Sequence, residues 1–150
     1  MYAFGAAREA SNITAKYDII EQAWDTSLPA RPYRGDHHAA VVVHNNIFLV
    51  GALGPDCLLD ECAGLVQIFD TVLSTWSTAP SFPSAQGSIN VVSINAIVYG
   101  CGGLLHYEHK KNGKNPTTCY KLDSKNLEVG WVQIHDMLEG VDHGCAVGFD

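Results

Sequence analysis

Short apolar runs separated by turn residues fill the chain, and none of them shows a helical period. Residues 38–44 are rich in β-branched side chains and apolar on both faces, which is typical of a buried strand. A second apolar run at 47–50 ends at Gly51, and a third at 65–69 follows a long connection. The polar run at 74–78 completes the set. Four such strands in sequence predict an antiparallel meander.

The same order returns in the next stretch of sequence. Residues 88–94 match the first strand, 97–99 the second, 119–123 the third and 129–134 the fourth. The tight turns fall at Asn45-Asn46 in one unit and at Asn95-Ala96 in the next, since Asn tolerates a left-handed backbone. The chain therefore contains a repeated four-stranded unit.

Two residue types mark the period of the repeat. The spacings between successive aspartates are 52 and 53 positions, and those between successive tryptophans are 52 and 55: Asp18, Asp70 and Asp123, then Trp24, Trp76 and Trp131. A period of roughly 50 residues without helical pattern indicates an array of β-propeller blades. We predict an all-β fold whose tryptophans pack between neighbouring blades.

The order of these motifs resembles a kelch repeat. Arg34-Gly-Asp-His37 opens one unit, Gly102-Gly103 ends a second strand, and Phe69-Asp70 is an aromatic-Asp pair before the tryptophan. Tyr17-Asp18 repeats that pair, while Gly51-Ala52 is a weaker copy of the double glycine. The resemblance implies that each unit forms one four-stranded antiparallel blade.

The blade boundaries predict about three blades' worth of an incomplete propeller. A partial blade spans 1–26, whole blades span 37–78 and 86–135, and a further blade starts at 142–150. Propellers close with about four to eight blades, so unpaired strand edges remain. One interpretation is a fragment of a longer kelch chain. The other is a homodimer completing a six-bladed propeller, in which each C-terminal strand completes the N-terminal blade of the other chain.

Charge and composition narrow the partners. The formal net charge is −7, which disfavours binding to nucleic acid or to anionic membranes. No run approaches the roughly 20 apolar residues of a membrane span, and the N-terminus lacks a secretion signal. We expect a cytoplasmic or nuclear protein. An odd count of five cysteines suits a reducing compartment better than a disulfide framework, although Cys57 and Cys62 could form a loop disulfide or half a metal site.

Partner binding is expected on one face. In a four-stranded meander the connections between second and third strands share a face with the links between blades, and here those segments are long: 28–36, 53–64 and 104–117. Kelch adaptors are similar in binding peptides with arginines and aromatics from this face. The candidate partner-binding residues are Arg31, Arg34, Asp36, Asp60, Glu61, His106, Tyr107 and Lys110.

Catalytic and metal chemistry is weakly indicated. His106-x-x-His109, flanked by Cys101 and Cys119, has short Cys/His spacing of the kind that zinc prefers, but the intervening loop is long and rich in lysine. We predict no metal site, no cofactor and no catalytic residue, since neither a nucleophile motif nor a phosphate loop is present. His37 and His143 occupy the histidine position of the repeat and are interpreted as structural.

The leading hypothesis is a protein–protein interaction scaffold that binds a protein or peptide. The alternative is a fragment of a kelch-propeller enzyme resembling galactose oxidase or a sialic acid mutarotase. The copper-binding tyrosines and histidines of such an oxidase cannot be assigned to residues here. A third reading is a decayed gene copy without function.

Overall fold

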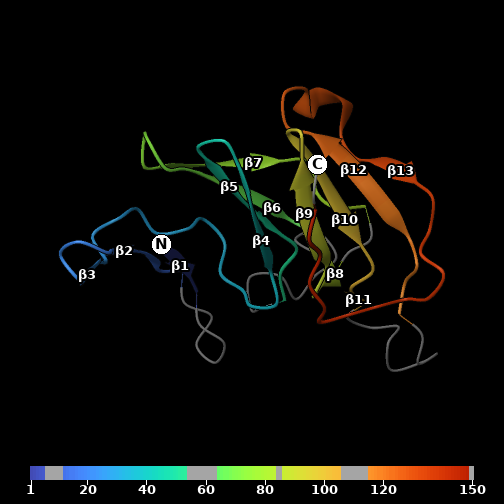
Figure 1. Cartoon of the computed structure of the whole chain (residues 1–150), viewed down its shortest axis with the longest axis horizontal. Helices are drawn as coiled ribbons and strands as arrows, with labels where there is room; N and C mark the ends of the chain where they lie inside the picture. Colours follow the sequence, from blue (N-terminus) through green and yellow to red (C-terminus); the bar gives the residue numbers. More distant parts are fainter. Residues whose placement is uncertain (6–11, 54–63, 84–85, 106–114, 149–150) are drawn as a thin grey trace.

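The computed structural model describes residues 1–5, 12–53, 64–83, 86–105 and 115–148. Their regular structure is almost all β-strand, in three antiparallel sheets of three or four strands and a two-stranded ribbon. Figure 1 shows the three sheets side by side in chain order. No helix in the described part of the chain is long and apolar enough to span a membrane.

We name the sheets by their place in the chain. The N-terminal sheet contains β1 (Tyr2–Phe4), β2 (Thr14–Asp18) and β3 (Ala23–Asp25). The middle sheet contains β4 (Ala39–Val43), β5 (Asn46–Val50), β6 (Val66–Asp70) and β7 (Thr75–Ala79). The C-terminal sheet contains β9 (Asn90–Ile94), β10 (Ile97–Cys101), β12 (Cys119–Asp123) and β13 (Val132–Ile134). The ribbon pairs β8 (Gln86–Gly87) with β11 (Leu104–Leu105).

Each sheet is an antiparallel meander, so the prediction of four-stranded antiparallel units is confirmed for the middle and C-terminal sheets. Two local details differ. The first hairpin of the middle sheet turns at His44 and Asn45, one residue earlier than expected, with His44 at a φ of 52°. The last strand begins at Val132 rather than 129, because a 3₁₀ helix at Leu127–Val129 ends at Gly130 with a φ of 72°.

The repeated aspartates hold the turn between third and fourth strands. Asp70 Oδ1 accepts hydrogen bonds from the backbone N–H groups of Val72 and Leu73, both 2.8 Å long. Asp18 and Asp123 accept equivalent bonds in their own sheets. These backbone donors lower the pKa of the Asp18 carboxyl, because they favour its charged form. The regular spacing of the aspartates in the sequence therefore reflects one turn that recurs in every sheet.

Two apolar cores lie between neighbouring sheets. The larger joins the middle and C-terminal sheets, with buried Phe48, Ile68, Val98 and Leu122 among its members. The smaller joins the N-terminal and middle sheets, where Ile47, Leu49 and Phe69 meet side chains of β1. Each sheet thus buries a face against the next one along the chain, as blades of a propeller do.

Tryptophans fasten the middle and C-terminal sheets to the links that precede them. The indole N–H of Trp76 donates to the carbonyl of Pro29 at 3.0 Å, and that of Trp131 donates to the carbonyl of Pro80 at 2.8 Å. The first strands β4 and β9 lie against each other, where Ser93 Oγ donates to the Val42 carbonyl at 2.8 Å. The stack therefore has the order of a propeller that does not close.

Candidate functional site

The links between sheets are hydrogen-bonded to the described ends of the long connections. In each unit, the backbone N–H of a link residue donates to the backbone carbonyl of the residue two positions before the third strand. These backbone hydrogen bonds run from Arg31 to Asn12 (2.8 Å), from Phe82 to Gly64 (2.7 Å) and from Met137 to Thr117 (2.8 Å). We call the surface that these segments form the long-loop face.

Three of the candidate partner-binding residues fall in the link before β4. Arg31, Arg34 and Asp36 lie within the described part of the chain. The loop candidates Asp60, Glu61, His106, Tyr107 and Lys110 lie outside the described residues. The structure therefore brings together only the link residues of the predicted set.

Arg31 is 1% exposed and holds the link in place. Its Nη2 donates to the Gly35 carbonyl, and its Nη1 lies 3.1 Å from His38 Nδ1. A Cβ on Gly5 would stand 2.8 Å from Nη2, so this glycine lets the guanidinium pass beneath the end of β1. Burial of the whole side chain gives Arg31 a structural role within the link.

The environment of His38 supports that arrangement. Burial, followed by the neighbouring Arg31 charge, lowers the pKa of His38 from 6.5 to about 4. The ring is therefore neutral near pH 7, so its Nδ1 can accept the hydrogen bond from Arg31. The link that carries Asp36 is thus held in place by hydrogen bonds among its own residues.

Two histidines meet where the first strands begin. The rings of His37 and His143 lie 5.3 Å apart in an edge-to-face arrangement. Each ring lies beside the preceding carboxylate, with 2.6 Å from His37 Nδ1 to Asp36 and 3.4 Å from His143 Nδ1 to Asp142. We call these four residues the axial cluster, because the innermost strands of the stack start there.

The axial cluster follows from the repeat. His37, Ser88 and His143 hold the same position in successive units, and all have a positive φ, of 54°, 54° and 47°. Ser88 N–H donates to the His37 carbonyl at 2.6 Å, which ties the second unit to the first. The recurring Asp-His dipeptide was the signal for this cluster, although the sequence interpretation gave its histidines only a structural role.

The cluster offers partly exposed imidazoles and carboxylates to a ligand. Neutral imidazole both donates and accepts hydrogen bonds, and the carboxylates attract cationic groups. In the described ranges, no group of three or more His, Cys, Asp or Glu side chains is placed to hold a metal ion. The axial cluster is therefore a group of polar, partly exposed side chains.

One pair of cysteines is joined in the structure, which the odd count of five did not lead us to expect. Cys101 and Cys119 form a disulfide, with Cα atoms 4.2 Å apart. They lie directly opposite on β10 and β12, so the sheet register alone brings them together. Their sulfurs are therefore not available to the zinc site considered with His106 and His109, which lie outside the described residues. Cys145 is free and exposed.

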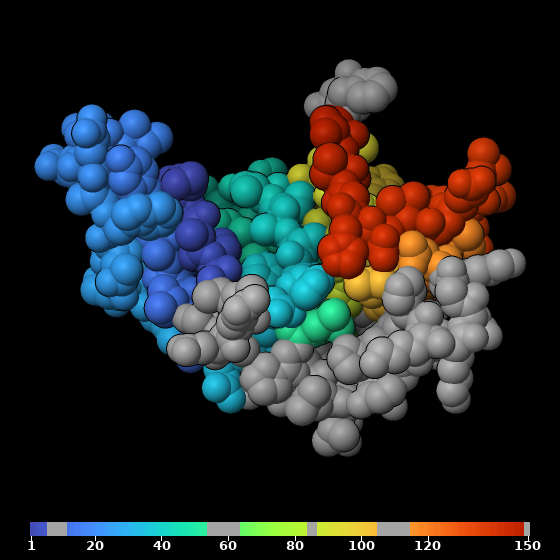
Figure 2. All heavy atoms as spheres, turned by 90° about the horizontal axis from the view of Figure 1, so that it is seen from below, coloured from blue at the N-terminus to red at the C-terminus, as the bar shows by residue number. Residues whose placement is uncertain are grey.

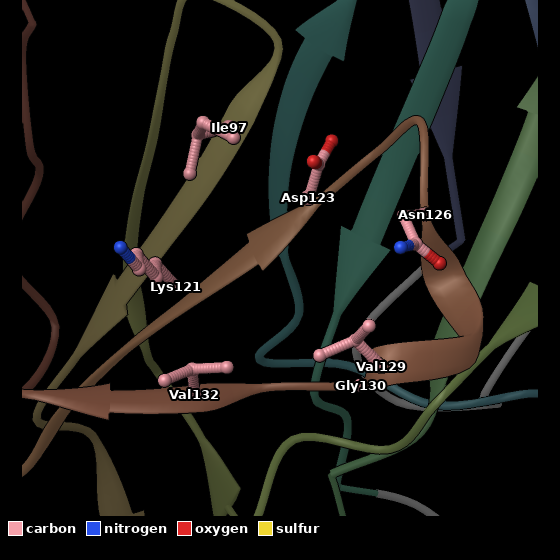
Figure 3. Close-up of a pocket in the computed structure, with 7 residues that line it drawn as sticks. All are labelled: Ile97, Lys121, Asp123, Asn126, Val129, Gly130 and Val132. Atoms are coloured by element: carbon pink, nitrogen blue, oxygen red, sulfur yellow. The ribbon is translucent and has the colours of Figure 1, made fainter.

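Two hollows lie on the C-terminal sheet, on the face turned away from the middle sheet. One, of about 180 Å³, is lined by Ile97, Lys121, Asp123, Asn126, Val129, Gly130 and Val132 (Figure 3). The other, of about 250 Å³, lies between Tyr99, Cys101, Met137 and Cys145. Neither includes a residue of the axial cluster.

Comparisons with known proteins agree with this architecture. No family model matches the sequence. The chain is 26% identical over 137 residues to the Kelch-like protein terF of Aspergillus terreus, which covers 89% of the chain and 29% of the relative. The structure matches that of YjhT with a TM-score of 0.69 and 16% identity, covering 95% of the chain and 50% of YjhT.

The chain thus spans under a third of its curated relative and half of the solved propeller. Three features converge on one assignment: the repeated motifs, the stack of antiparallel sheets and the match to a kelch-type propeller over nearly the whole chain. The chain has the fold of part of a kelch-type β-propeller and is similar in sequence to a Kelch-like protein.

Proposed function

We propose that the chain is an interaction scaffold that binds a protein or peptide through the long-loop face. The observation that carries this proposal is the bonding of every described link to the described end of a long connection, with the axial cluster where a link enters β4. Buried cores behind the face keep its residues in fixed positions. A rigid scaffold that presents loops and links is a common way to build a binding surface.

Charge indicates the kind of partner. Asp36 and Asp142 place two carboxylates at the axial cluster, and the chain carries a formal charge of −7. An acidic surface speeds association with basic ligands and disfavours acidic ones. The proposed partner therefore presents lysine or arginine side chains.

The test starts from peptides selected against the folded chain from a displayed random library. Binding of a selected peptide is then measured for the double variant Asp36→Asn/Asp142→Asn. We expect at least a tenfold loss of affinity and enrichment of basic residues among the selected peptides. The matched control Glu21→Gln/Glu128→Gln removes the same charge from exposed turns between third and fourth strands. Equal loss in both variants, or no selectable peptide, would refute the proposal.

A second candidate function is a piece of a propeller enzyme resembling galactose oxidase or a sialic acid mutarotase. The 2.6 Å contact between His37 and Asp36 favours it, because a carboxylate that orients an imidazole is a common general-base arrangement. Copper uptake with oxidase turnover, or catalysed interconversion of sialic acid anomers followed by NMR, would favour this function. Retention of peptide binding without either activity would favour the scaffold.

A further inference from the structure

In the part of the chain that the structure describes, each end of the stack has one sheet face without a neighbouring sheet. The leading face belongs to the N-terminal sheet and carries Ala3, Tyr17 and Trp24, turned away from the middle sheet. The trailing face belongs to the C-terminal sheet and carries Tyr99 and Lys121, together with the two hollows. Inside the chain, a leading face meets a trailing face twice.

The register shows what the trailing face corresponds to. The hairpin pair Val43–Asn46 of the middle sheet matches Ile94–Ile97 of the C-terminal sheet. Four residues of the middle sheet face the C-terminal sheet and are 6% exposed or less. In the order of the chain, the C-terminal sheet has these residues at the equivalent positions: Tyr99 for Phe48, Cys101 for Val50, Cys119 for Val66 and Lys121 for Ile68. The trailing face therefore repeats a surface that the chain buries elsewhere.

The leading face has a tryptophan without the link that its counterparts use. Arg31 and Phe82 are the link residues whose N–H groups bond to a long connection. Trp76 donates to the carbonyl two residues before Arg31, and Trp131 donates to the carbonyl two residues before Phe82. Trp24 occupies the same position but is 50% exposed. Met137 is the equivalent link residue of the C-terminal sheet, so the acceptor for Trp24 would be the carbonyl of His135, two residues earlier, in the partner copy.

The strand edges also match. In the described structure the N-terminal sheet begins with a second strand, so the backbone groups of Tyr2 and Phe4 that point away from β2 face an open edge. The C-terminal segment, residues 141–148, lies along β9, where Asn90 Nδ2 donates to the Val141 carbonyl and a Cβ on Gly148 would touch Ile94. Figure 2 shows it in red over the C-terminal sheet. It occupies the place of a first strand.

We propose that a second copy of the chain fills both gaps. The leading face of each copy docks on the trailing face of the other, and each C-terminal segment pairs with β1 of its partner. Two such contacts, related by a twofold axis, close a ring of six blades. YjhT has twice the length that the chain covers, so two copies supply the same amount of propeller.

Side-chain size supports the docking. Inside the chain Phe82 packs over Gly100, where a Cβ would stand 2.7 Å from the ring. The counterparts at the proposed contact are Met137 and Ala3, again a large link residue opposite a small strand residue. Lys121, which replaces Ile68, can cover apolar surface with its stem while its ammonium group reaches the rim.

The internal register predicts which residues meet. His37 corresponds to His143, so Ala40 corresponds to Ala146, and Leu49 corresponds to Ala3. Since β4 pairs Ala40 with Leu49, Ala146 of one copy lies opposite Ala3 of the other. Ala3 bonds towards β2, so this is a non-hydrogen-bonded pair with close Cβ atoms, which suits a disulfide.

The first test is the solution mass of the full chain by light scattering. We expect a dimer of twice 16.2 kDa, and deletion of residues 142–150 should convert it to a monomer. A monomeric or aggregated full chain would overturn the proposal and assign both open faces to further blades of a longer chain. Solution mass and cross-linking report the dimer, whereas peptide affinity of Asp36→Asn/Asp142→Asn reports the binding surface, so failure of this proposal and failure of the peptide-binding proposal are distinguishable.

The second test is a cross-link in a Cys145→Ser background. The double variant Ala3→Cys/Ala146→Cys should form a covalent dimer under mild oxidation, seen by mass spectrometry and non-reducing electrophoresis. The matched control Ala23→Cys/Ala146→Cys moves the first cysteine to β3, at the far edge of the same sheet, and should not. Equal cross-linking of the two variants would refute the register.

Discussion

Phe82 allows a quantitative test of how one sheet is locked to the next. Although it lies in a link, its side chain is 2% exposed, and its ring makes edge-to-face contacts with Tyr120 and Trp131 at 5.2 and 5.0 Å. Removing a buried phenylalanine ring costs about 3–5 kcal/mol of unfolding free energy. Two aromatic pairs supply about 1–3 kcal/mol of that.

Gly100 makes the test specific. A Cβ at this position would stand 2.7 Å from Cε2 of Phe82, so Gly100→Ala forces the ring to move and should cost about 1–3 kcal/mol. In a Phe82→Ala background the obstacle is absent, and the added methyl fills part of the cavity. The double variant should then be more stable than the sum of the single variants predicts, by about 2 kcal/mol or more.

The assay is urea unfolding followed by tryptophan fluorescence and circular dichroism, with Trp131 as the local reporter. The matched control pairs Phe82→Ala with Gly148→Ala, whose Cβ would meet Ile94 instead of Phe82. That cycle should be additive. If the effects of Phe82→Ala and Gly100→Ala add to within about 0.5 kcal/mol, the contact between Phe82 and Gly100 does not lock the two sheets together.

Three further perturbations test separate contacts. Because the pKa of His38 is about 4 in the folded chain and 6.5 otherwise, the unfolded state binds more protons between these values. Unfolding free energy should fall by about 2 kcal/mol from pH 7.5 to 5, and His38→Gln should flatten that slope in urea titrations at both pH values. Trp76→Phe removes an indole hydrogen bond and should cost about 1 kcal/mol, whereas Trp24→Phe should leave monomer stability unchanged and weaken self-association about tenfold or more, measured by sedimentation. Gly64→Ala should cost over about 2 kcal/mol in thermal unfolding, since φ is 76° and a Cβ would lie 2.3 Å from the Phe82 carbonyl.

Much of the fold could be read from the sequence because its markers have local causes. Asp70 holds a turn through its own neighbours, and Gly102 adopts a positive φ where a second strand ends. Such residues recur wherever the backbone repeats, so their spacing reveals the blades. Strand ends were harder to predict, as at Gly130, where the backbone conformation ends a 3₁₀ turn within a predicted strand.

The candidate site was less readable, since burial depends on the assembled fold. Arg31 has the composition of a binding residue, yet it lies beneath β1 with its guanidinium on Gly35 and His38. The disulfide between Cys101 and Cys119 joins residues 18 positions apart and becomes visible only with the strand register.

The two proposals meet at the axial cluster. His37 precedes the first strand of a complete blade, whereas His143 precedes the segment that would complete the partner's first blade. In the proposed dimer, each chain would supply half of a ring of equivalent positions, occupied in order by His37, Ser88 and His143. Closing the ring would repeat the Asp-His pairs around a twofold axis and double the carboxylates facing a basic ligand. Peptide affinity would then depend on chain concentration, because the binding surface and the subunit interface would be completed by the same segment.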